Sequence, residues 1–240
     1  MSNILKLKDV IKLKSIPLPK KTKSYTPISH CEIINHIEQQ APLHWKPKGY
    51  KIILKNNGKE LFGTVDFDNK LVTNDLITIG FRNSYNKNIS MGICAGTKVI
   101  VCSNLMFIGD IIKIRRHTLN IKIDLKRIIT ETIIHAESSA KQLQKDMKKL
   151  ESVKINNKDA AKIIGEAFFN RNILSSQQVN KIKKEWNNGN YSKIHGLNEK
   201  CKKRTLYSLY QACTDALKSS TTNRMLENHI NLHTYFISLN

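Results

Sequence analysis

The sequence lacks the features that mark membrane and secreted proteins. No apolar run approaches the roughly 18 residues that a membrane-spanning helix requires. The first residues contain neither the apolar segment nor the cleavage site of a secretory signal. We therefore expect a protein that has no membrane partner and is not exported.

Cysteine pairs are also missing. The five cysteines are odd in number and include no CxxC spacing, which argues against a zinc ribbon or a disulfide framework. They are Cys31, Cys94, Cys102, Cys201 and Cys213. We expect reduced thiols and a cytoplasmic location inside a host cell.

Motifs for nucleotide binding and metal-assisted catalysis are absent as well. The sequence has no phosphate-binding loop, no GxGxxG opening a helix and no cluster of carboxylates. His229 and His233 share a helix face, but they lack the intervening glutamate of a zinc protease and a third ligand. A role in helix packing is the favoured interpretation for them. We expect no metal and no other cofactor.

Acidic residues are scarce relative to basic ones. Lys and Arg number 40 against 19 Asp and Glu, which gives a formal net charge of +21. Such an excess attracts polyanions and favours nucleic acid as the partner. A solvated surface that only aids solubility is the alternative, and a low-GC genome contributes to the abundance of lysine.

The 240 residues fit one large domain or two small ones. Residues 1–27 are basic and contain Pro17, Pro19 and Pro27, which predicts an arm rather than a helix. We expect a β-rich core over 28–125 and a helical region over 126–240 that packs on it. The expected fold class is α+β, with an antiparallel, twisted sheet in the N-terminal half packed against a long helix.

A hairpin is the clearest strand signal. Tyr50–Leu54 and Glu60–Phe67 flank the sequence Asn56-Asn57-Gly58-Lys59, and an Asn-Gly pair between apolar runs favours a tight turn with positive φ. Further strands are predicted at about 71–81, 88–95, 97–103 and 111–116. The sheet should contain five or six strands.

Helices are expected before and after this sheet. Ser29 is a candidate N-cap for a helix over 30–40, and Ser175 with Gln178 forms a capping-box pattern for a helix ending near Trp186. A long helix is indicated by apolar residues that alternate spacings of four and three. These are Ile129, Ile133, Ala136, Ala140, Leu143, Met147 and Leu150. Other helices are predicted at 158–170, 203–218 and 223–236.

Polar residues after the third predicted strand form a candidate site. Arg82 and Asn83 suit contacts to phosphate or a base edge, but they equally suit an Asx turn that joins two strands. Lysines at helical spacing next to Trp186 suit a phosphate backbone and base stacking. The predicted nucleic-acid-binding residues are Arg82, Asn83, Lys87, Arg115, Arg116, Lys181, Lys183, Lys184, Lys202, Lys203 and Arg204.

A Cys–His pair is the one candidate for catalysis. Cys102 and His117 each end a predicted strand and would form a nucleophile and a base if the fold brought them together. The apolar run before Cys102 favours instead a buried cysteine that acts as a small hydrophobic residue. We therefore expect no catalytic residues.

Several short motifs resemble a family. Gly80–Tyr85, the pair Gly92 and Gly96, Val99–Asn104 and Arg116–Thr118 occur in the order found in the phage- and plasmid-encoded family called domain of unknown function 932. Thr205–Ala216 resembles a late helix of that family. The resemblance covers about residues 28–237 and implies a viral or mobile-element origin, but it supplies no activity.

Charge and resemblance together lead to one main hypothesis and two others. The first is a non-enzymatic protein that binds nucleic acid, preferably single-stranded DNA, in recombination or replication, and that forms an oligomer. Its likeness to annealing proteins is an analogy at the level of the fold. The second is an anti-defence or regulatory protein that binds a host protein or nucleoprotein. An enzyme using Cys102 and His117 is the third.

Overall fold

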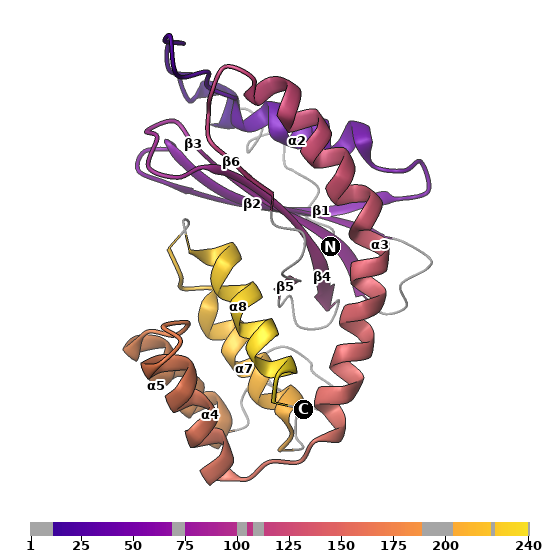
Figure 1. Ribbon diagram of the computed structural model, residues 1–240, viewed down its shortest axis with the longest axis vertical. Coiled ribbons are helices and arrows are strands. Elements are labelled where there is room, and N and C mark those ends of the chain that lie inside the picture. Colours follow the sequence, from indigo (N-terminus) through magenta and orange to yellow (C-terminus); the bar gives the residue numbers. More distant parts are fainter. Residues whose placement is uncertain are drawn as a thin grey trace. The chain divides into compact units, whose positions relative to one another are not determined.

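The computed structural model describes residues 12–68, 75–99, 105–107, 113–188, 204–221 and 224–239 (Figure 1). The contacts divide the chain into two units. The first comprises Met1–Gly96 and Asp110–Ala140, and the second comprises Thr97–Gly109 and Lys141–Asn240. The boundary falls within a long helix and not at the start of the helical region near residue 126.

The sheet has six strands in the order β1-β2-β3-β4-β5, with β6 paired to β4. These strands are β1 (Lys46–Lys55), β2 (Glu60–Asp68), β3 (Asp75–Ser84), β4 (Met91–Val99), β5 (Leu105–Phe107) and β6 (Lys113–Arg115). The pairs β1–β2, β2–β3 and β4–β6 are antiparallel. The predicted α+β fold with an N-terminal antiparallel sheet is confirmed. Most of the strand predicted at 97–103 lies outside the described residues.

The predicted hairpin joins β1 to β2. Lys55 pairs with Glu60, and the backbone of Asn56, Asn57 and Gly58 has positive φ values of 52°, 55° and 82°. A Cβ at Gly58 would also lie 2.7 Å from a side-chain carbon of Ile16. Glycine is therefore required at this turn by both conformation and space.

Strand β3 ends three residues later than predicted, at Ser84 and not at residue 81. Arg82 pairs with Phe62 and Asn83 pairs with Leu61, so both residues belong to the strand and not to a loop after it. The expectation of free side chains at a strand end is wrong for these two residues, because both are buried. The cause is that β2 extends to Glu60 and provides pairing partners for the end of β3.

The N-terminal segment is not a free arm from residue 12 onward. Leu13, Tyr25 and Ile28 are buried, and the backbone N–H of Thr26 donates to the carbonyl of His117 at 3.1 Å. The prolines do exclude regular structure around them, as predicted, but the apolar residues between the lysines pack on the first unit. Residues 12–27 thus contact the first unit, whereas residues 1–11 of the predicted arm lie outside the described residues.

Helix α2 (His30–Gln40) begins after Ser29, whose hydroxyl accepts a hydrogen bond from the N–H of Glu32 at 3.0 Å. The predicted cap is confirmed. Ile33 and Ile37 face a core that also contains Val65, Ile79 and Phe81 of the sheet. Together with the first part of the following long helix, α2 thus covers one face of the sheet (Figure 1).

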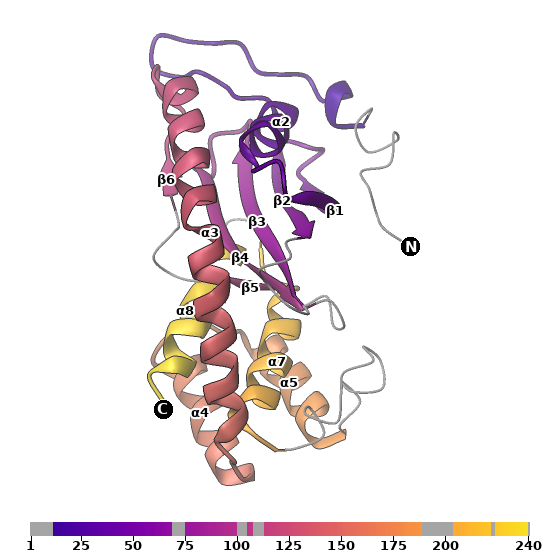
Figure 2. The same ribbon diagram turned by 90° about the vertical axis from the view of Figure 1, so that its right-hand side faces the viewer.

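The predicted long helix is α3 (Ile121–Ser152), seen along its length in Figure 2. All seven residues of its predicted apolar seam are buried. Ile129, Ile133, Ala136 and Ala140 belong to the core of the first unit, whereas Leu143, Met147 and Leu150 belong to the core of the second. The seam is therefore a packing face, as predicted.

The second unit contains four further described helices: α4 (Asn157–Phe169), α5 (Ser176–Asn188), α7 (Leu206–Leu217) and α8 (Met225–Ile237). The capping box before α5 is confirmed: Ser175 N–H donates to Gln178 Oε1 at 2.9 Å, and Gln178 N–H donates to Ser175 Oγ at 3.4 Å. A second box joins Asn156 and Asp159 at the start of α4. These local signals fix where the helices begin.

Candidate functional site

Asn83 joins three segments of the first unit. Its Nδ2 donates to the carbonyl of Ile28 at 2.9 Å and lies 3.0 Å from Nδ1 of His30. Its Oδ1 accepts from Nε2 of His117 at 2.7 Å. We call Tyr25, His30, Asn83, Tyr85 and His117 the polar junction. Asn83 and His117 come from two of the motifs that carry the family resemblance, and the fold places them in direct contact.

The strand alternation explains why an amide reaches this position. Ile77, Ile79 and Phe81 point to the core from β3, and Asn83 continues the same row. A buried amide without partners would be strongly destabilising. Here the amide N–H groups bind the carbonyl of Ile28 and the ring of His30, and the amide oxygen binds the ring of His117.

The hydrogen bonds hold His30 in one neutral form. Its Nδ1 accepts from Asn83, so Nε2 carries the proton and donates to the carbonyl of Gly58 at 2.9 Å. The ring stacks on Tyr85 with 4.0 Å between centroids and 4° between planes. Burial lowers the pKa of His30 to about 4. The hydrogen bond to the Gly58 carbonyl opposes this decrease, and the nearby His117 adds to it.

The remaining members of the polar junction are neutral too. Burial lowers the pKa of His117 and raises the pKa of both Tyr25 and Tyr85. The hydroxyl of Tyr85 accepts from the backbone N–H of His30 at 2.9 Å. The hydrogen bonds of these neutral groups connect β3, the start of α2 and the segment after β6. Cys102, the predicted partner of His117, lies outside the described residues.

Exposed cations border the polar junction. Lys59 follows the Gly58 carbonyl that His30 contacts, Arg116 precedes His117, and the ammonium of Lys87 lies 4.6 Å from the ring centre of Tyr25. The polar junction therefore holds three segments that each carry one exposed positive charge. Two of these residues, Lys87 and Arg116, are predicted nucleic-acid contacts, and the described structure leaves both exposed.

The other predicted residues of the first unit are engaged within the protein. Arg82 is 5% exposed, and its Nε donates to the carbonyl of Ser90 at 3.3 Å. A Cβ at Gly92 would come within 3.1 Å of this guanidinium, so the glycine leaves room for it. Arg115 forms a 2.6 Å ion pair with Asp124. Of the predicted set in this unit, only Lys87 and Arg116 are exposed.

The predicted lysines of the second unit divide in the same way. Lys181 pairs with Asp215 at 2.7 Å, whereas Lys183 and Lys184 are exposed. Arg204 lies over the ring of Trp186 at 5.1 Å. Lys202 and Lys203 lie outside the described residues.

His233 forms a second buried polar contact, in the second unit. Its Nε2 lies 3.2 Å from Oδ2 of Asp146, and its Nδ1 lies 3.3 Å from the hydroxyl of Tyr210. Burial lowers the pKa of His233, while the Asp146 carboxylate opposes that change. His229 is also buried, in agreement with the predicted packing role of these two histidines. No group of three potential metal ligands occurs within the described residues.

The sequence predicts nucleic-acid binding for the basic cluster over residues 141–204, which includes Lys145, Lys148 and Lys149, although these lysines are not among the individually predicted site residues. Lys141, Lys145, Lys148 and Lys149 lie on the outer face of α3, and we call them the α3 lysine face. Their exposure could be predicted from the sequence. If Ala140, Leu143 and Met147 form the buried seam of a helix, these four lysines lie on its solvent-facing side. The polar junction, in contrast, had no local signal.

Comparison with known proteins adds a family and no activity. Residues 17–234 match the model of a family described as a domain of unknown function, DUF932. No curated protein and no solved structure shows a significant match. None of the helices described here is long and apolar enough to cross a membrane.

Proposed function

We propose that this chain, which belongs to the DUF932 family across residues 17–234, binds nucleic acid without catalysing a reaction. The preferred ligand is single-stranded DNA, handled during recombination or replication of a phage or similar element. The action would take place in the cytoplasm, in keeping with the unpaired thiols of Cys31, Cys94 and Cys213.

The observation that carries this proposal is the α3 lysine face. Its four residues occupy positions i, i+4, i+7 and i+8 of one helix, and all are exposed. Within the described residues, none of the four has a carboxylate within ion-pair distance. Like charges at this spacing destabilise a helix by roughly 0.2–0.5 kcal/mol per pair, so the protein itself gains nothing from their arrangement. A polyanion would remove that repulsion.

Some basic residues of the first unit are paired with acidic ones. Lys48 pairs with Asp68 at 3.1 Å, and Arg127 pairs with Glu131 at the same distance. Within the described residues, the α3 lysine face forms no such ion pair, although Glu137 and Glu151 lie on the same helix. Its exposed, unpaired charges support an external anion as the partner.

The exposed cations around the polar junction give further support. Lys59, Lys87 and Arg116 are carried on segments that buried hydrogen bonds hold in place. Preorganised cations lose less conformational entropy on binding phosphate than free ones. They suit non-directional attraction to a phosphate backbone.

The test is the salt dependence of binding to a labelled oligothymidine, measured by fluorescence anisotropy between 50 and 200 mM salt, concentrations typical of such titrations. The variant replaces all four residues of the α3 lysine face by Gln. A matched control replaces Lys12, Lys20, Lys46 and Lys55, four exposed lysines of the first unit, by Gln and changes the net charge equally.

We expect the α3 variant to bind weakly and its log–log salt slope to flatten by up to about 3, since each phosphate contact on a single strand contributes about 0.7. The control should keep most of the slope. Equal losses in both variants would show that net charge alone attracts the strand. Unchanged binding in the α3 variant would overturn the proposal and favour a protein partner.

A further inference from the structure

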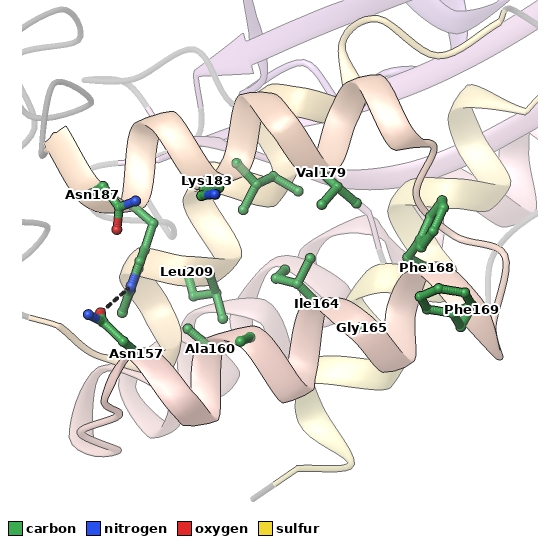
Figure 3. A pocket seen from close by; sticks show the side chains of 13 residues that line it. Asn157, Ala160, Ile164, Gly165, Phe168, Phe169, Val179, Lys183, Asn187 and Leu209 are labelled. Atoms are coloured by element: carbon green, nitrogen blue, oxygen red, sulfur yellow. Dashed lines mark hydrogen bonds between the residues drawn. The ribbon is translucent and has the colours of Figure 1, made fainter.

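A groove lies between α4 and α5 in the second unit, and Leu209 of α7 forms part of its lining (Figure 3). Its volume is about 520 Å³, which falls within the range of small-molecule sites. Ile164 and Phe168 of α4 lie opposite Val179 of α5 across it, and Ile182 of α5 also lines it. The body of the groove is therefore an aliphatic and aromatic trough.

The two ends of the groove differ in polarity. Asn157, Lys183 and Asn187 lie toward one end, and Phe168 and Phe169 lie at the other (Figure 3). Asn157 is held at its end by the indole N–H of Trp186, which donates to its Oδ1 at 3.0 Å. Arg204 contacts both of these residues and adds a second cation there. The lining described here contains no carboxylate.

Gly165 leaves part of this trough open. It lies inside α4, where glycine is among the weakest helix formers. A Cβ built on it would meet no atom within 4 Å, so the packing of the protein itself does not require a glycine. At the same end Phe169 is 77% exposed. Both features are accounted for if another molecule occupies the space beside α4.

Charge narrows the choice of occupant. A second copy of the chain would bring the same cations, Lys183 and Arg204, against each other. An anionic group would be attracted to Lys183 and Arg204, the two cations at this end of the groove, whereas a cationic group would be repelled by them. Because the groove is polar and basic at one end and apolar at the other, it suits a molecule with one anionic end and an apolar tail.

We propose that this groove binds an acyl carboxylate, with the carboxylate beside Lys183 and the chain directed along α4 past Gly165 toward Phe168. The helical span from Asn157 to Phe169 is about 18 Å, enough for a medium-length chain in extended form. The binding is reversible and involves no covalent step. The proposal does not rest on the α3 lysine face, although Lys183 and Arg204 are also predicted nucleic-acid contacts.

The experiment is a titration of the full chain with sodium dodecanoate below its micelle concentration. The chain has two tryptophans, and Trp186 lines the groove, so the Trp45→Phe background reports on this site alone. Dodecyltrimethylammonium, with the same tail and the opposite charge, is the matched ligand control. We expect saturable binding of dodecanoate with a single site and at least roughly tenfold weaker binding of the cation.

Four variants locate the site. Gly165→Leu fills the trough and should abolish the saturable signal, while Lys183→Gln should weaken dodecanoate binding about tenfold without changing the response to the cation. Lys184→Gln removes a neighbouring exposed lysine that does not line the groove and should bind like the parent. Gly165→Ala, a smaller change that favours the helix, serves as a second filling variant with an intermediate loss.

Each contrary result overturns the proposal. Non-saturable binding, equal affinity for the cationic tail, or a Gly165→Leu variant that binds like the parent would exclude an acyl carboxylate in this groove. Binding confined to phosphatidylglycerol vesicles would assign the groove to a membrane surface. Displacement of dodecanoate by oligothymidine would assign it to nucleic acid.

Discussion

In the first unit, His30 and His117 are joined through the amide of Asn83, whereas in the second unit His233 lies between the carboxylate of Asp146 and the hydroxyl of Tyr210. All three rings are buried. The difference lies in what each ring would meet after gaining a proton. Protonated His30 would turn an N–H toward the Nδ2 of Asn83, which is itself a donor.

Burial is the main cause of the lowered pKa of both His30 and His233, and the neighbouring groups change how far each pKa falls. Burial lowers the pKa of His30 to about 4, and no carboxylate contributes to that value. Burial also lowers the pKa of His233, but Asp146 works against it through a hydrogen bond and its charge. The amide fixes a neutral form in the first unit, and the carboxylate leaves the second unit more tolerant of acid.

The largest effect is expected from Asn83→Leu, which keeps a similar shape and removes every polar group. It leaves the Ile28 carbonyl, Nδ1 of His30 and Nε2 of His117 without partners. Since each buried unsatisfied group costs about 1–3 kcal/mol, we expect the first unit to lose roughly 4 kcal/mol. Urea unfolding followed by Trp45 fluorescence in a Trp186→Phe background measures it.

The second unit should be unaffected by this change, as Trp186 in a Trp45→Phe background would report. Asn35→Leu, the same substitution at an exposed position of α2, is the control and should cost little. A loss below about 1 kcal/mol in Asn83→Leu would mean that water or a rearrangement satisfies the freed groups.

Acid should destabilise the first unit through His30. The folded-state pKa of about 4 lies below the value near 6.5 for an unfolded chain, so the unfolded state binds more protons between these values. The stabilisation is complete above about pH 6.5 and is lost as the pH falls toward 4, by on the order of 3 kcal/mol.

Comparing the parent with His30→Gln separates the contribution of His30 to the pH dependence of stability from that of the carboxyl groups. The pH dependence of Trp45-monitored unfolding should be shallower in His30→Gln, while His135→Gln, at an exposed site on α3, should follow the parent. Parallel curves for parent and His30→Gln would refute the assignment of a lowered pKa to His30.

Asp146→Asn should cause the smallest loss of stability. It would give His233 an amide partner, like that of His30 in the first unit. It removes the charge that favours protonated His233 and keeps an amide oxygen that can still accept a hydrogen bond. We expect the pKa of His233 to fall further and the second unit to lose about 1–2 kcal/mol at pH 7. Imidazole proton shifts measured by NMR against pH give the first quantity, and Trp186-monitored unfolding gives the second. A rise in the pKa would contradict the role given to Asp146.

Features determined by neighbouring residues were predictable from the sequence. The alternation from Ile129 to Leu150 predicted the buried seam of α3 because helix periodicity alone decides which residues share a face. The turn at Asn57 and Gly58 and the cap at Ser175 were predictable for the same reason. Each depends on residues only a few positions apart.

Features determined by distant residues were not predictable. Asn83 is two residues beyond the core residue Phe81, so the alternation indicated an inward side chain, but the partners that make this tolerable are 34 to 55 residues away. Lys181 is paired with an aspartate 34 residues later, which no local pattern reveals. Sequence indicated which residues are basic, and only the fold shows which of them remain free.

Asn83 also has a consequence for the order in which the first unit forms and comes apart. Its hydrogen bonds close loops to Ile28, His30 and His117, separated from it by 55, 53 and 34 residues. Closing such loops carries an entropic penalty, so we expect these contacts to form late in folding, after the strands and α2 have assembled. Interactions that are absent from the folding transition state slow unfolding without speeding folding. We therefore expect the amide of Asn83 to prolong the lifetime of the folded first unit more than it changes the folding rate.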